Sequence, residues 1–248
     1  MRPSNGICII NQPAGLGDIF CCLKIAKNIS ERYKFNIIWP VISEYNYISQ
    51  YLQYNDIWFV DEVLDFPYKS VYKSGNINII KNDEFIYLPL RTSSRIYNDI
   101  EIFKSKYKLA NLEYSDWSSY FNFSRNLVKE DILFYDNLKL KDDDNYIVVN
   151  NIFASPPNSQ VRPNMNIQGK DRVIYMDYIK GFTPFDWCKV LENANEIHMV
   201  DTCYSFLLEK LTLNSDNVNI YSRFITDNTP SFTETQWLFS KKFNWVHR

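Results

Sequence analysis

Residues 6–18 decide the fold, and they read Gly6-Ile7-Cys8-Ile9-Ile10-Asn11-Gln12-Pro13-Ala14-Gly15-Leu16-Gly17-Asp18. The first part is a short apolar run rich in β-branched side chains, which predicts a buried strand. The proline and glycines that follow predict a turn. Apolar side chains then recur at near-helical spacing from Ile19 to Ile29, which predicts an amphipathic helix. The chain therefore opens with a strand, a glycine-rich turn and a helix.

Strands and helices are expected to continue through the first half of the chain. Residues 36–39 are apolar and end at Pro40, which predicts a second strand. A strand, a helix and a strand in this order favour a parallel sheet. The other elements expected in this half are strands over 57–60 and 85–88 and helices over 98–107 and 117–134. Residues 137–145 carry charge and few core-forming side chains, which predicts a domain boundary.

A second alternation of strands and helices follows this boundary. The expected elements are strands over 146–150, 172–176, 196–200 and 218–221 and helices over 183–193 and 204–213. The start at Thr183 is typical of a helix, because threonine caps well and Pro184 suits the first helical position. The amphipathic tail over 232–245 predicts a final helix that packs back across both halves.

These elements predict an α/β protein of two Rossmann-like halves. The first domain is expected over residues 1–140 and the second over 141–248. A length of 248 residues allows one large domain or two small ones. With 46% hydrophobic and 23% charged residues the composition is that of a globular protein, and six Gly and ten Pro exclude a collagen-like or disordered chain.

Charge and hydropathy exclude further classes. The net charge of −2 supplies no strong field for nucleic acid or anionic lipid, so no nucleic-acid partner is expected. No run of about 18 apolar residues is present, so no transmembrane segment is expected. The apolar run near the N-terminus is too short for the core of a signal peptide. The abundance of Asn, Ile, Lys and Tyr is typical of an AT-rich genome, such as that of a virus or phage.

Cysteine usage indicates the compartment. The count of five is odd, and Cys21 and Cys22 are adjacent, so they cannot bridge without strain. This pattern is typical of reduced thiols, which persist in the cytosol. We therefore expect a cytoplasmic protein without a disulfide framework.

The glycine-rich turn is the first candidate site. Gly15 and Gly17 let a ligand come close to main-chain N–H groups, and the helix that follows offers unpaired N–H groups and a partial positive charge. Asp18 beside the turn is a candidate base, although a carboxylate there also serves as a plain partner of the helix dipole. An ordinary strand-to-helix turn is the alternative. The dinucleotide fingerprint needs a third glycine, so a NAD(P)-dependent Rossmann enzyme is the weaker prediction.

The second candidate site lies at a later helix start. Asp201, Thr202 and Ser205 follow the strand expected over 196–200, where hydroxyls and N–H groups can hold phosphate oxygens. An ordinary cap is the alternative.

Two further segments follow strands, at the edge where open α/β sheets bind ligands. In the segment 151–162, Asn151, Ser155 and Arg162 are candidate ligand contacts, with a surface loop as the alternative. After the strand expected over 85–88, Arg91 and Arg95 are further candidate ligand contacts, and a solvated loop is equally compatible. Arg223 follows the last strand as a weaker candidate.

Gly15-Leu16-Gly17-Asp18 after an N-terminal strand, with Val200-Asp201-Thr202 and Ser205 before a late helix, resembles the ADP-heptose:lipopolysaccharide heptosyltransferase family and its GT-B relatives. The resemblance implies that the two halves face each other across a cleft, that the first domain binds the acceptor and that Asp18 is the catalytic base. It also implies that Asp201, Thr202 and Ser205 face the diphosphate of a nucleotide sugar, the donor. In such an enzyme the candidate contacts over 151–162 would meet this donor, and Arg91 and Arg95 would meet the acceptor. Two departures argue against heptose as the donor sugar, because Cys203 stands at the Gly of the motif and Phe206 at its His.

The expected reaction follows from this resemblance. A hydroxyl of a glycan or glycoconjugate attacks the anomeric carbon of the nucleotide sugar, a carboxylate removes its proton, and N–H groups or arginines stabilise the departing diphosphate. The resemblance implies inversion and no metal ion. The alternative class is a nucleotide-sugar-binding protein without turnover, which the two departures motivate.

No cofactor and no metal ion are expected. The only histidines are His198 and His247, and no Cys or His pair has the spacing of zinc ligands. His198 lies in an apolar strand, which favours a hydrogen-bonded core residue. The run over 142–144 is acidic like the Asp-x-Asp metal motif of other glycosyltransferases, but it precedes a strand, which favours a solvated charge run.

Overall fold

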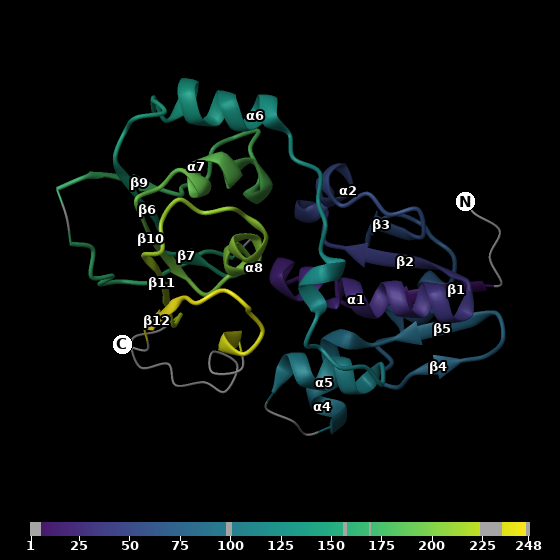
Figure 1. Cartoon of the computed structure of the whole chain (residues 1–248). Coiled ribbons are helices and arrows are strands. Elements are labelled where there is room, and N and C mark those ends of the chain that lie inside the picture. The colour runs from purple at the N-terminus through teal and green to yellow at the C-terminus, as the bar shows by residue number, and fades with distance from the viewer. Residues whose placement is uncertain (1–5, 98–100, 156–157, 169, 224–234, 247–248) are drawn as a thin grey trace. The chain divides into compact units, whose positions relative to one another are not determined.

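The computed structural model describes residues 6–97, 101–155, 158–168, 170–223 and 235–246. The chain divides into two compact units, Met1–Ser124 and Arg125–Arg248. Each unit contains a five-stranded sheet with helices packed against it (Figure 1). The predicted α/β class, with a largely parallel sheet in each half, is confirmed.

The sheet of the first unit has the strand order β3-β2-β1-β5-β4. Its parallel strands are β1 (Gly6–Ile10), β2 (Phe35–Val41), β3 (Ile57–Asp61) and β5 (Phe85–Leu88), and β4 (Ile80–Lys81) is antiparallel at the edge. The chain builds outward from β1 to β3 and then crosses to β5 on the other side of β1. The strand order therefore reverses between β1 and β5, and this is the position where sheets of this kind bind ligands.

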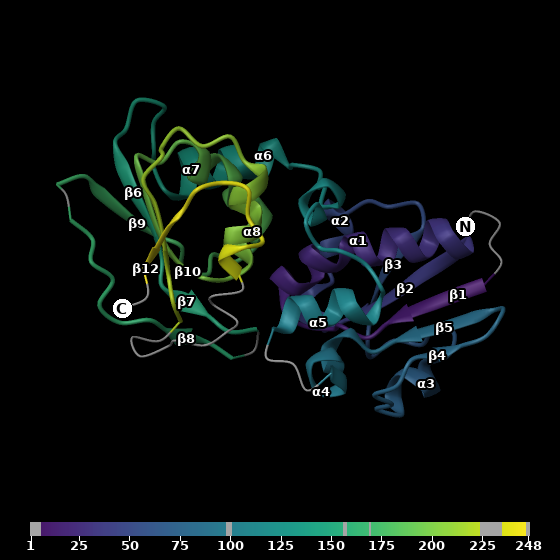
Figure 2. The ribbon, with the colours of Figure 1, turned by 60° about the horizontal axis from the view of Figure 1, so that its bottom comes forward.

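Helix α1 (Leu16–Tyr33) buries an apolar stripe that includes Ile19, Leu23 and Ala26, as its spacing predicts. Helix α3 (Lys69–Lys73) lies on the other face of the sheet (Figure 2). There Phe66 and side chains of α3 pack on a cluster that contains Ile9, Ile38, Phe85 and Tyr87. The remaining helical elements of this unit are η1 (Ser43–Tyr45), α2 (Ile48–Tyr51), η2 (Leu90–Thr92), α4 (Ser93–Tyr97), α5 (Ile102–Leu109) and η3 (Trp117–Tyr120).

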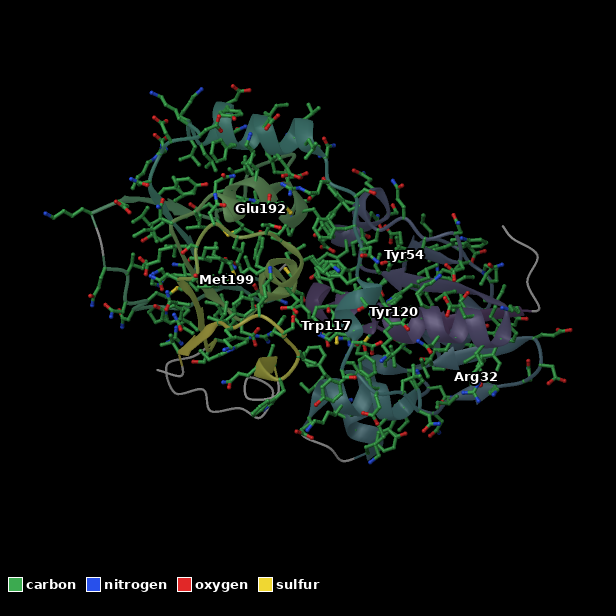
Figure 3. All side chains as sticks on the ribbon, viewed as in Figure 1. Arg32, Tyr54, Trp117, Tyr120, Glu192 and Met199 are labelled. Atoms are coloured by element: carbon green, nitrogen blue, oxygen red, sulfur yellow. The ribbon has the colours of Figure 1, made fainter. Side chains whose placement is uncertain are left out.

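The single helix expected over 117–134 is wrong. After η3 the chain is extended until α6 (Leu127–Asp131) and the π-helical η4 (Ile132–Asn137) begin. The break arises because the chain just after η3 is held by side chains of the first unit. Phe121 stacks on Phe20, and the Tyr54 phenol donates to the carbonyl of Tyr120 at 2.8 Å (Figure 3). For the helix expected over 98–107, residues 98–100 lie outside the described residues, and α5 begins at Ile102.

The boundary between the units lies at Ser124 and Arg125, earlier in the chain than the charged run over 137–145. The reason is the hydrogen bonding on either side of it. The Ser124 N–H donates to the carbonyl of Tyr51, at 2.8 Å, in the first unit. The Arg125 guanidinium binds Glu130, and Glu192 at 2.6 Å, in the second unit. The helical segment that follows Arg125 therefore belongs to the second unit.

The sheet of the second unit has the order β12-β11-β10-β6-β9, and all its strand pairs are parallel. The strands are β6 (Tyr146–Asn150), β9 (Arg172–Tyr175), β10 (Glu196–Val200), β11 (Val218–Tyr221) and β12 (Asn244–Val246). Its order reverses between β6 and β10. A hairpin of β7 (Ile152–Phe153) and β8 (Gln160–Val161) follows β6, and the helices are η5 (Pro184–Trp187), α7 (Cys188–Glu192) and α8 (Cys203–Lys210). The helix start predicted at Thr183 is confirmed by a capping box, in which the Thr183 N–H donates to Asp186 at 2.7 Å.

Of the final helix expected over 232–245, Thr235 and Gln236 are helical among the described residues, and the prediction is wrong for the rest of the described part, where β12 is a strand. β12 pairs with β11 from Asn219↔Asn244 to Tyr221↔Val246. The apolar spacing of the tail arises from aromatic packing instead, since Phe239 contacts both Phe243 and Trp245. Residues 232–234 lie outside the described residues.

All five cysteines are free in the structure. Among the described residues, no helix has the length and hydrophobicity that crossing a membrane requires. The cytoplasmic location stays a prediction.

Candidate active site

The turn between β1 and α1 has the conformation that only glycine adopts without strain. Gly15 caps α1 with a φ of 81°, in the left-handed region. A Cβ atom at this position would lie 2.4 Å from Oδ2 of Asp18, so the turn needs glycine for space as well. Asp18, in the first turn of α1, therefore folds back over Gly15 with its side chain 28% exposed. Gly17 lies in the same helical turn.

A buried lysine completes this site. Nζ of Lys106, from α5, lies 2.8 Å from Oδ1 of Asp18, and Lys106 is only 2% exposed. The same ammonium donates to Oε1 of Gln12. The main chain of Gln12 is itself fixed, because its carbonyl accepts a hydrogen bond of 2.9 Å from the Trp39 indole.

Sequence reasoning missed Lys106 and Gln12. The sequence of α5 contained a signal for Lys106. This lysine lies three residues after Phe103 and three before Leu109, and both of these apolar residues are buried. A lysine on the apolar face of a helix needs a charged partner. The pattern alone does not say that this partner is Asp18.

Lys106 stays charged at neutral pH. Burial lowers the pKa of Lys106, but the Asp18 carboxylate with its hydrogen bond, together with the neighbouring Cys22 and Cys21, raises it, so that the pKa is raised overall. Two thiols also lie near this ammonium. Burial raises the pKa of Cys22 to about 12 and that of Cys21 well above its usual range, so both are neutral.

Arg91 follows β5, whereas the turn follows β1, and the strand order reverses between these two strands. Its N–H donates to the carbonyl of Asn11 at 2.8 Å, and the Asn11 N–H donates to Leu88 at 2.9 Å, which joins the chain after β1 to the end of β5. The Arg91 side chain is exposed. The structure thus brings Gly15, Asp18 and Arg91 to one edge of the first sheet. Arg95 lies one turn further along, on α4, and is also exposed.

Replacing Gly15 by alanine is expected to displace the Asp18 carboxylate and to lower any catalytic activity that depends on it. Gly75→Ala is a matched control, because Gly75 has a φ of 68° and nothing within 4 Å of an added Cβ. Both variants should lose about 1–2 kcal/mol of folding free energy from the left-handed backbone. Only Gly15→Ala should also break the bond between Asp18 and Lys106. Thermal melts and crystal structures of both variants check this, and an unmoved Asp18 in Gly15→Ala would contradict it.

In the second unit, Thr202 lies where the strand order reverses between β6 and β10. It caps α8, and its Oγ1 accepts from the Tyr204 N–H and from Nδ2 of Asn150, both at 3.4 Å. Because both lone pairs of this hydroxyl accept hydrogen bonds, its proton is available for donation to a ligand. This arrangement suits an anionic oxygen at the helix N-terminus. Sequence reasoning missed Asn150, the last residue of an otherwise apolar strand.

The other residues of this helix start face the protein interior. Ser205 is fully buried, and its hydroxyl donates to Oδ1 of Asp201 at 3.4 Å. Asp201 is itself buried, and its carbonyl accepts from Nε of Arg223 at 3.2 Å. Thr202 is thus the hydroxyl of this motif that is placed to meet a ligand.

Arg162 is not part of a surface loop. It is 1% exposed, Nη1 donates to the carbonyl of Ser222 at 2.6 Å, and the guanidinium lies 5.4 Å from the Tyr221 ring centroid. Its N–H donates to the carbonyl of Asn151 at 2.8 Å, which closes the hairpin of β7 and β8. Ser155 lies at the tip of this hairpin, where its carbonyl accepts from Asn158. Arg162 therefore holds the chain after β11, beside the end of the sheet.

Within the described ranges, no group of three or more His, Cys, Asp or Glu side chains is placed to hold a metal ion. The acidic run over 142–144 lines a cavity of about 570 Å³ with Asn195 and Asp216, ahead of the strands rather than after them. His198 is buried and bonds Tyr221 at 2.8 Å and Glu196 at 2.7 Å, which confirms the prediction of a hydrogen-bonded core residue.

No protein-family model matches the sequence, and no curated protein matches it. Solved structures do resemble the chain. The dodecameric iron-containing heptosyltransferase TibC, in complex with ADP-D-beta-D-heptose, has a TM-score of 0.50 at 9% identity over 100% of this chain and 64% of that one. A second structure of TibC, described as a glycosyltransferase from enterotoxigenic E. coli, has a TM-score of 0.47 at 9% identity over 99% and 63%.

A glycosyl transferase of family 9 from Veillonella parvula has a TM-score of 0.48 at 11% identity, over 90% of this chain and 81% of that one. At such identities the likeness concerns the fold alone. The heptosyltransferase resemblance is thereby confirmed at the level of the fold, and the chain spans less than two thirds of the length of TibC.

Proposed function

We propose that this protein is a glycosyltransferase that moves a sugar from a nucleotide-sugar donor to a hydroxyl of a glycan or glycoconjugate. The observation that carries the proposal is the Asp18 turn, where a partly exposed carboxylate is fixed by a buried ammonium at a strand-order reversal. The second unit adds a hydroxyl donor, Thr202, at its own reversal. The fold shared with TibC, solved with ADP-heptose, supports a nucleotide sugar as the donor. The arrangement of the two halves across a cleft stays a prediction.

The proposed step is a single displacement. The acceptor oxygen bonds to the anomeric carbon while the bond from that carbon to the diphosphate oxygen breaks, and its electron pair leaves with the diphosphate. The proton of the acceptor hydroxyl passes to Asp18, which acts as a general base. Attack opposite to the leaving group inverts the anomeric centre.

In this proposal the departing diphosphate is held without a metal ion or other cofactor. The N–H groups that begin α8 and the Thr202 hydroxyl supply donors, and Arg223 supplies positive charge beside them. Arg162 acts indirectly, because its bond to Ser222 fixes the segment that carries Arg223. Arg91 and Arg95 are the proposed acceptor contacts.

The donor sugar is proposed to differ from heptose. Phe206, at the position of the motif His, is 3% exposed and packs edge-on against Phe239 with ring centroids 5.2 Å apart. It therefore belongs to the core and supplies no polar group to a sugar. Cys203, at the motif Gly, is the first residue of α8, and burial raises the pKa of its thiol to about 12.

Nucleoside diphosphates are expected to stabilise the protein. A ligand at 100 times its dissociation constant adds about 2.7 kcal/mol to the free energy of unfolding. Thermal melts with ADP, GDP and UDP measure this, and Thr202→Val should reduce the shift because the variant lacks the donating hydroxyl. A protein that none of the three diphosphates stabilises would contradict the donor site.

A non-catalytic nucleotide-sugar-binding protein is the second candidate. The inward-facing Ser205 and Phe206 favour it, because they leave α8 with fewer ligand contacts than its motif implies. Transfer and hydrolysis assays with ADP-, GDP- and UDP-linked hexoses separate the two functions. Stabilisation by a donor without turnover in any assay would favour this candidate.

A further inference from the structure

We infer that Lys106 is a positioning residue that holds Asp18 so that one carboxylate oxygen, Oδ2, is presented to the acceptor hydroxyl. The inference rests on the proposed function and adds to it a residue that neither the turn motif nor the resemblance indicates. It follows from three features of the first unit: the geometry of the ion pair, the fixation of the ammonium, and the charges around it.

The ion pair engages one oxygen of the carboxylate. Oδ1 of Asp18 lies 2.8 Å from Nζ of Lys106. Oδ2 lies over the α-carbon of Gly15, where an added Cβ would be 2.4 Å away. The two oxygens therefore have different surroundings. Oδ1 faces a buried ammonium, and Oδ2 lies over Gly15, which has no side chain.

The ammonium is fixed independently of Asp18. Lys106 donates to Oε1 of Gln12, and Nε2 of the same amide donates to the carbonyl of Ala14 in the turn. The Trp39 indole holds the carbonyl of Gln12. The turn, Gln12 and Lys106 thus form one hydrogen-bonded unit, and Asp18 is its partly exposed member.

The charges near Lys106 come from one side chain. The titratable groups that act on it are Asp18, Cys21 and Cys22, all on α1. Both thiols are neutral, because burial raises the pKa of each. Among the described residues, Asp18 is therefore the charged partner that compensates the buried ammonium, and the pairing is obligatory.

The role of the pair in the reaction follows from this geometry. The acceptor proton moves to Oδ2, the neutral carboxyl group that forms keeps its Oδ1 on the ammonium, and Lys106 gains or loses no proton. A carboxylate that rotates freely loses this alignment, and a displacement of about 1 Å costs up to about 10²-fold in rate.

The test compares Lys106→Met with wild type in the steady-state kinetics of transfer, using the nucleotide-linked hexose that wild type turns over. We expect kcat to fall about 10- to 100-fold with the donor KM unchanged, because the carboxylate is no longer held in place. Lys106→Arg keeps a positive charge but changes its position, so its kcat should fall as well.

Lys24→Met is the matched control. Lys24 is also largely buried, at 7% exposure, and its ammonium binds the carbonyl of Glu113 and the carboxylate of Asp116, away from Asp18. This variant should lose stability but keep the wild-type kcat per folded molecule. If Lys106→Met does not fold, Lys106→Arg decides the question by its kcat.

A Lys106→Met or Lys106→Arg enzyme with the kcat of wild type, per folded molecule, would overturn the inference and leave the proposed function standing. A wild type that transfers no sugar from any donor would overturn the proposed function instead.

Discussion

Asp18→Asn is expected to lose about 10²–10⁴-fold in kcat while still binding the donor, because a general base contributes a factor in this range and the amide cannot accept the proton. The substitution keeps the shape of the side chain and the hydrogen-bonding position of Oδ1. The donor contacts proposed here lie in the second unit, so the thermal shift by nucleoside diphosphates should stay that of wild type. Initial rates of transfer and thermal melts measure the two effects separately.

Asp116→Asn is the matched control for this variant. Asp116 is also paired with a lysine, Lys24, but its side chain is 53% exposed and it lies outside the turn. We expect this variant to transfer at the wild-type rate. Full activity in Asp18→Asn would remove Asp18 from the role of base.

Arg125→Met is expected to cost about 3 kcal/mol of unfolding free energy, because it leaves a buried carboxylate without its counter-ion. Glu130 is 1% exposed, and both its oxygens bind the Arg125 guanidinium, with Nε to Oε1 at 2.8 Å. Arg125 also bridges to Glu192 on α7. Chemical denaturation followed by circular dichroism gives the change.

Asp131→Asn tests whether the burial of Glu130 causes the loss of unfolding free energy in Arg125→Met. Asp131 directly follows Glu130 and binds Lys189 at 2.6 Å, but its side chain is 54% exposed. Exposed pairs contribute about 0–1 kcal/mol, so this variant should stay near wild type. Equal losses in the two variants would show that the burial of Glu130 does not set the cost.

The strands, the turn and the helix starts could be predicted because their signals are local. The run over 6–10 is apolar throughout, Gly15 supplies the left-handed cap, and Thr183 with Asp186 forms a capping box within four residues. Each of these depends on side chains that are neighbours in the sequence.

The errors occurred where partners distant in sequence decide the structure. Residues near Phe121 have a helical spacing of apolar side chains. These side chains instead pack individually against other parts of the first unit, as the stacking of Phe121 on Phe20 shows. β12 is short and depends on the open edge of β11 for its hydrogen bonds. The pair of Asp18 and Lys106 joins α1 to α5, and no local sequence pattern in either helix indicates that the two residues are partners.

The most direct test of this account is a crystal structure with the nucleoside diphosphate that stabilises the protein most. We expect the phosphate oxygens within about 3.2 Å of the Thr202 hydroxyl and of the first N–H groups of α8, at the carboxyl ends of β6 and β10. Ordered diphosphate bound elsewhere, for example in the cavity beside Asn195 at the opposite edge of that sheet, would contradict the account.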